Sequence, residues 1–97
     1  MEIKTKSEGS KLTISVSGRI DTVTAPELEA SFQFGDATSV VLDLADVPYM
    51  SSAGLRLLLI AHKTMLGKGG EFLIANAPLA VKEVLNITGF SGILNLV

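Results

Sequence analysis

The chain has 97 residues, the size of one ordinary domain, and 47% of them are hydrophobic, which is enough for a single core. Its eight lysines and arginines are spread along the chain and its formal net charge is −2, which argues against nucleic acid or anionic lipid as a partner. With no cysteine and a single histidine, His62, the chain offers no disulfide, no thiolate chemistry and no ordinary zinc site.

The N-terminus and the apolar runs set the expected location. The opening "MEIKTK" lacks the apolar core of a signal peptide, and the longest apolar runs are too short to span a bilayer. We therefore expect one domain, residues 1–97, in the cytoplasm and without membrane insertion.

The first third of the chain predicts a hairpin and a helix. Apolar residues alternate in "KLTISVSG", and the preceding "EIKTKSEGS" is typical of a weaker strand joined to it through a turn at Gly9. In "TAPELEASF", Thr24 stands three residues before Glu27, the spacing of a capping box, and Pro26 suits a first helical turn. A helix is therefore predicted to begin at Thr24 or Ala25.

The rest of the chain alternates strands and helices. The run "SVVLDLA" predicts a central strand buried on both faces, and a helix follows from Ser52 to Leu66, where a cluster of glycines ends it. "EFLIAN" predicts a strand, "APLAVKEVLNITG" a helix capped by Asn76 and ended by Gly89, and residues 93–96 a last short strand. The order β-β-α-β-α-β-α-β predicts an α/β fold with three main helices packed on a mixed sheet.

Paired serines before a helix invite comparison with a nucleophile elbow, but the pattern is absent. Ser52 is flanked at the required distances by Met50 and Gly54, so G-x-S-x-G is not formed. The only histidine, His62, lies ten residues further along the same helix, roughly 15 Å along its axis, and cannot serve Ser52 as a base. "GKGGE" also lacks the serine or threonine of a phosphate loop. We expect no enzymatic activity, no cofactor and no metal.

The predicted helix after the serines has an unusually wide apolar sector. At about 100° per residue, Arg56 and Lys63 share the polar face of Ser52. Beside that face lie Leu55, Leu59, His62 and Leu66, so this sector is wider than contact with one sheet requires. Either neighbouring loops cover these residues, or they form a docking strip. Ser52 itself fits a helix N-cap, a role that does not exclude phosphorylation.

Three stretches resemble the STAS domain family, and within it the small anti-sigma factor antagonists of bacteria. "GRIDTVTAPELE" resembles the family's second strand and first helix, and "VVLDLADVPYMSSAGLRLLL" its signature strand, loop and helix. "GGEFLIANAPLAVKEVLNITGF" resembles the closing strand and helix. The resemblance covers nearly the whole chain and implies the STAS fold.

The resemblance implies a partner switch. In that family the unphosphorylated antagonist binds an anti-sigma factor that is also a serine kinase and so frees the sigma factor. Phosphorylation ends the binding, and a serine phosphatase restores it. The family's phosphorylated serine, two positions before the signature glycine, maps onto Ser52. Many members carry aspartate where this chain has Ser51, so a second hydroxyl stands beside the expected site, and Ser51 is the alternative acceptor of the phosphate.

The expected interface surrounds Ser52. Asp21 matches an acidic residue of the family in a loop on the same side of the sheet, although it also fits a structural turn residue. The expected partner-binding residues are Asp21, Ser51, Ser52, Leu55, Arg56, Leu59 and Lys63. Two alternatives stay open: a STAS scaffold subunit of a transporter or sensory complex in which Ser52 is not phosphorylated, and nucleotide binding by the domain itself.

Overall fold

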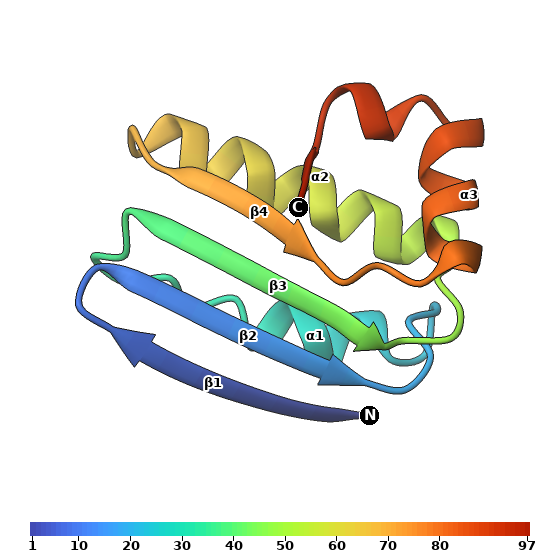
Figure 1. Ribbon diagram of the computed structural model, residues 1–97. Helices are drawn as coiled ribbons and strands as arrows, with labels where there is room; N and C mark the ends of the chain where they lie inside the picture. Colours follow the sequence, from blue (N-terminus) through green and yellow to red (C-terminus); the bar gives the residue numbers. More distant parts are fainter.

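One five-stranded sheet carries the helices of this chain, as the computed structural model of all 97 residues shows (Figure 1). The strands follow the spatial order β1-β2-β3-β4-β5; the first pair is antiparallel and the others are parallel. The predicted α/β order is confirmed. The elements are β1 (Glu2–Glu8), β2 (Lys11–Ser17), α1 (Ala25–Ala30), β3 (Ser39–Asp46), α2 (Ser52–Gly67), β4 (Glu71–Ala75), α3 (Leu79–Ile87), the 3-10 turn η1 (Phe90–Gly92) and β5 (Asn95–Leu96).

The predicted hairpin and first helix are confirmed in place, but the predicted capping box is wrong. β1 and β2 pair from Glu2–Ser17 to Glu8–Lys11, and α1 begins at Ala25. The hydroxyl of Thr24 makes no cap bond. It donates to the Arg19 carbonyl at 2.8 Å and accepts from the Asp21 amide at 2.9 Å, so it closes the preceding loop instead.

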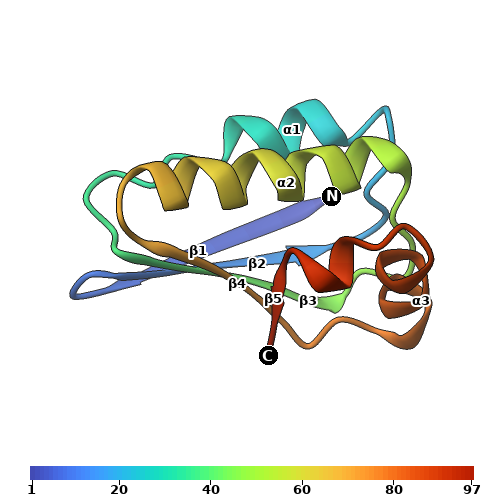
Figure 2. The same cartoon turned by 90° about the horizontal axis from the view of Figure 1, so that it is seen from above.

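The core lies between the sheet and the helices. Both α1 and α2 cover the same face, and the other face of the sheet has no helical layer over it (Figure 2). The side chains of Val40, Leu42 and Leu44 are fully buried, whereas Val41 and Asp43 on the open face are only half-buried. β3 is therefore central, as predicted, but the prediction that it is buried on both faces is wrong.

In the C-terminal third of the chain, the beginning of α3 differs from the prediction. Asn76 does not cap α3, which begins at Leu79 after Pro78. Instead Asn76 adopts a left-handed backbone with φ of 56° and its amide donates to the Asp43 carboxylate at 3.3 Å. Gly89, with φ of 80°, follows the end of α3 as predicted. None of the helices combines the length and the apolar character that crossing a bilayer requires.

The first turn of α2 lies unusually close to the two chain segments beneath it. Ile20 and Met50 form an isolated parallel bridge between the loops that precede α1 and α2. A Cβ atom added to Gly54 would lie 2.6 Å from Cγ of Met50 and 2.7 Å from Cγ2 of Ile20. Only glycine at this position therefore allows α2 to begin so close to Ile20 and Met50.

We expect Gly54→Ala to lower the free energy of unfolding, because the overpacking, which costs about 1–3 kcal/mol, outweighs the helix propensity that alanine adds. Gly67→Ala is the matched control. Gly67 is the last residue of the same helix, and a Cβ atom there would meet nothing within 4 Å. Urea unfolding should show a loss of stability for the first variant and none for the second; equal stabilities would contradict the close packing.

Candidate functional site

Two loops at the carboxyl ends of β2 and β3 are joined by backbone hydrogen bonds. The amide of Ile20 donates to the Tyr49 carbonyl at 3.0 Å, and the amide of Ser51 donates to the Ile20 carbonyl at 2.8 Å. Asp21 follows Ile20 on the first loop, and Ser52 follows Ser51 on the second. The structure therefore brings Asp21 and the serine pair to one edge of the sheet, as expected.

The two serines differ in burial. Ser51, not Ser52, is the N-cap residue of α2, and its hydroxyl makes no cap hydrogen bond. The Oγ atom of Ser51 is buried without any hydrogen-bond partner. Ser52 is the first helical residue and is exposed to solvent. The expectation that Ser52 caps the helix is wrong by one residue, and the accessible hydroxyl belongs to Ser52.

We expect Ser51→Ala to leave the free energy of unfolding unchanged or to raise it by up to about 1 kcal/mol. The substitution removes a buried hydroxyl that has no partner, whereas a serine that caps a helix typically contributes about 1 kcal/mol. Thermal unfolding of this variant beside Ser52→Ala checks the expectation. A loss of about 1 kcal/mol for Ser51→Ala alone would show that the hydroxyl caps α2 in solution.

Asp21 organises the first loop. Its Oδ1 atom accepts from the amides of Val23 at 2.9 Å and Thr24 at 3.1 Å, and its Oδ2 atom lies 3.8 Å from Nε of Arg19. The hydrogen bond from Thr24 is the main cause that lowers the pKa of the Asp21 carboxyl; the Val23 amide and the charge of Arg19 act in the same direction. Asp21 thus has the structural role considered from the sequence, and it also borders Ser52.

The lowered pKa predicts how stability depends on pH. Because the folded state favours the charged carboxylate, its contribution is present above the ordinary aspartate pKa of 3.8 and is lost as pH falls through the lower folded value. Asp21→Asn keeps an oxygen acceptor but no charge. We expect wild type to be more stable than this variant at neutral pH and the two to converge in acid. A difference that persisted unchanged down to pH 2 would contradict the assignment.

The polar face of α2 is exposed as predicted, but the apolar sector beside it is only partly so. Arg56 and Lys63 are exposed, and neither forms an ion pair within the chain. Leu55 is only 5% exposed and Leu59 is half-buried. Leu55 is part of the one hydrophobic core that the sheet and the helices share.

The expectation of an open docking strip is therefore wrong for Leu55 and for His62, which are both buried. The helical spacing considered only the sheet as a covering surface, whereas the folded chain leaves 5% of Leu55 and 8% of His62 exposed.

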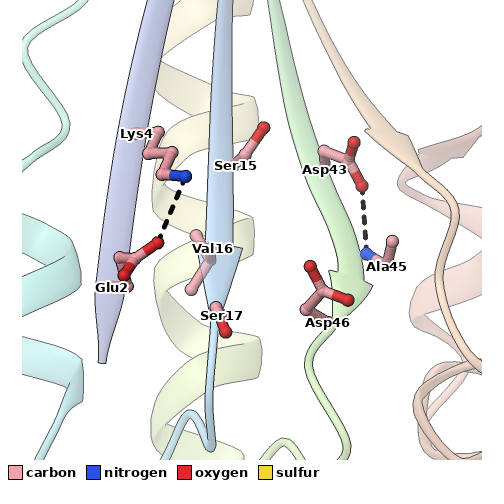
Figure 3. A pocket seen from close by; sticks show the side chains of 8 residues that line it. All are labelled: Glu2, Lys4, Ser15, Val16, Ser17, Asp43, Ala45 and Asp46. Atoms are coloured by element: carbon pink, nitrogen blue, oxygen red, sulfur yellow. Dashed lines mark hydrogen bonds and ion pairs between the residues drawn. The ribbon is translucent and has the colours of Figure 1, made fainter.

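A hollow lies on the open face of the sheet, away from the helices and Ser52. Figure 3 shows it between the beginning of β1 and the ends of β2 and β3. Lys4 is paired with Glu2 at 3.4 Å, and one oxygen of Asp43 accepts from the Ala45 amide at 3.0 Å. The one lysine of the hollow and one oxygen of Asp43 thus already have partners within the chain. The lining residues are Glu2, Lys4, Ser15, Val16, Ser17, Asp43, Ala45 and Asp46.

Sequence reasoning missed three residues beside Ser52. The guanidinium of Arg19 lies 4.3 Å from the centre of the Tyr49 ring, and Val23 is 83% exposed. Arg19 and Tyr49 lie 30 positions apart, and no spacing rule pairs them. The charged carboxylate at Asp21, which fixes this loop, was the one available signal.

The comparisons with known proteins agree on one family. The model of the STAS domain family matches residues 2–97. A protein of Bordetella bronchiseptica named as an anti-sigma factor antagonist is 40% identical over 67 residues, which are 69% of this chain and 57% of that protein. The anti-sigma-B factor antagonist of Listeria monocytogenes is 28% identical and is aligned over 99% of this chain and 86% of its own length.

A solved structure gives the same picture. The crystal structure of an anti-sigma factor antagonist from Mycobacterium paratuberculosis superimposes with a TM-score of 0.87 at 28% identity. The superposition covers 98% of this chain and 83% of that one.

Proposed function

This chain belongs to the STAS domain family, and we propose that it is an anti-sigma factor antagonist controlled by phosphorylation at Ser52. In its unphosphorylated form it binds an anti-sigma factor that is also a serine kinase, and a sigma factor is released. Phosphoryl transfer from ATP held by the kinase ends the binding. The chain supplies the acceptor hydroxyl, and a serine phosphatase restores the first state in the cytoplasm.

The observation that carries this proposal is the contrast between the two serines. Ser52 presents its side chain to solvent on the first turn of a 16-residue helix, whereas the Ser51 hydroxyl is buried below it. A kinase must bring the acceptor oxygen into line with the γ-phosphate of ATP. Ser52 can enter an active site as it stands, and Ser51 would require the loop to open. The contrast supports Ser52 as the acceptor.

The domain is suited to carry the added phosphate. A phosphoserine has nearly two negative charges at neutral pH, and the N-terminal end of a helix attracts negative charge by about 0.3–1 kcal/mol. Arg56 lies one turn further along the same exposed face and has no ion-pair partner. The phosphorylated domain should therefore keep its fold.

For a bound partner, in contrast, the phosphate would be unfavourable. A protein packed over Ser52, Arg56 and the exposed part of Leu59 would have to remove the phosphate from water, which costs several kcal/mol unless the partner supplies a cation. Asp21 adds a fixed negative charge at the same edge of the sheet. Phosphorylation would thus end binding by charge and steric exclusion, without a change of shape in the antagonist.

We expect the purified chain mixed with its kinase and ATP to gain one phosphate, located at Ser52 by mass spectrometry, and to gain none with ATP alone. By calorimetric titration, Ser52→Asp should lose most of its affinity for the kinase while its melting temperature stays within a few degrees of wild type. Ser52→Ala should bind and should not be phosphorylated.

Ser7→Asp is the matched control, because Ser7 is exposed on β1 at the opposite end of the sheet. It should bind as wild type does. A phosphate on Ser51, equal affinities for Ser52→Ala and Ser52→Asp, or transporter subunits as the only proteins recovered with the chain would each contradict the proposal; the last would favour a scaffold subunit.

A further inference from the structure

Arg19, Val23 and Tyr49 form a loop platform beside Ser52. Val23 is 83% exposed and Tyr49 is 42% exposed. A single exposed apolar residue is ordinary on a protein surface. These residues are distinguished by the hydrogen bonds and the stacking that hold them, and by their position on the two loops that backbone hydrogen bonds join next to the proposed phosphorylation site.

The first loop presents Val23 in a fixed position. The Asp21 carboxylate accepts from the Val23 amide at 2.9 Å and from the next amide at 3.1 Å, and the Thr24 hydroxyl donates to the Arg19 carbonyl at 2.8 Å. Both ends of the turn are therefore tied. A loop whose main chain is held in this way loses little conformational entropy when a partner covers it, which favours affinity.

The second loop presents an aromatic ring that the first loop covers on one side. The Arg19 guanidinium lies 4.3 Å from the centre of the Tyr49 ring and makes only a long contact, 3.8 Å, with Asp21. Its side chain is 62% exposed, so most of its donors are free to meet a carboxylate in the forked geometry that arginine favours. Tyrosine and arginine are also the residue types most enriched at energetic centres of interfaces.

The area that a typical protein interface covers is large enough to include both Ser52 and this platform. A stable protein complex buries about 800 Å² on each partner, an area with a radius of about 16 Å. The Ser51 amide bonds to the Ile20 carbonyl, and the Ile20 amide bonds to the Tyr49 carbonyl, so the two loops that carry the platform are joined next to the serine pair. An interface of this size centred on Ser52 would therefore extend over these loops.

We propose that Arg19, Val23 and Tyr49 fix the anti-sigma factor kinase in register over Ser52. The partner would offer an apolar pocket to Val23 and a carboxylate to Arg19. This inference rests on the proposed function and adds to it the part of the interface that supplies affinity, as distinct from the serine that switches it.

The test uses the purified kinase that phosphorylates the chain, with affinity and dissociation rate measured by surface plasmon resonance. Val23→Ser and Arg19→Gln should each weaken binding at least about tenfold, mainly through faster dissociation. Their melting temperatures should stay near that of wild type, because both side chains are exposed. Leu66→Ser is the matched control: Leu66 is 57% exposed and lies about 21 Å from Ser52 along α2. Its affinity should not change.

The outcomes separate the two proposals. If Ser52→Asp loses binding while Val23→Ser and Arg19→Gln bind like wild type, the platform is wrong and the proposed function stands. If no such kinase binds or phosphorylates the wild-type chain, both are wrong. If the chain alone sediments as a dimer that Val23→Ser dissociates, the platform is a surface for a second copy and the inference is overturned.

Discussion

The close approach of α2 to the Ile20–Met50 bridge determines the geometry of the proposed site. Gly54 allows the contact, since a Cβ atom there would lie within 2.7 Å of both neighbours. The bridge holds two loops that belong to different crossovers, and the helix begins directly above them. At this start of α2 the Oγ atom of Ser51 is buried, and Ser52, the first residue of the helix, is exposed.

The proposed switch follows from that arrangement without requiring the protein to move. The site has a rigid base of backbone hydrogen bonds and one exposed hydroxyl at the positive end of a helix dipole. A phosphate there is tolerated by the domain, since Arg56 is free to approach it, and is excluded by a partner that must remove it from water. In the two proposals affinity and control reside in different residues: the loop platform would supply contact, and Ser52 would decide whether contact is possible.

The sequence predicted the order of strands and helices because hydrophobic periodicity and glycine positions mark them locally. The predictions were wrong where a polar side chain could form more than one hydrogen bond. Thr24 had the spacing of a capping box, yet its hydroxyl bonds to Arg19 and Asp21, and Asn76 pairs with Asp43 instead of capping α3. Leu55 was misjudged because the helical spacing considered the sheet alone as a covering surface, whereas only 5% of this side chain is exposed in the folded chain. The Arg19–Tyr49 stack joins two loops and has no local signature.

The central claim is that phosphorylation changes the charge of this surface and leaves its shape unchanged. Amide hydrogen exchange measured on the unphosphorylated and the Ser52-phosphorylated chain tests it most directly. The informative amides are those of Ile20, Ser51 and Leu55, which bond the two loops to each other and close the first turn of α2. We predict equal protection of these three amides in both forms. Loss of protection on phosphorylation would show that the phosphate opens the loops, and it would contradict a switch that acts by exclusion alone.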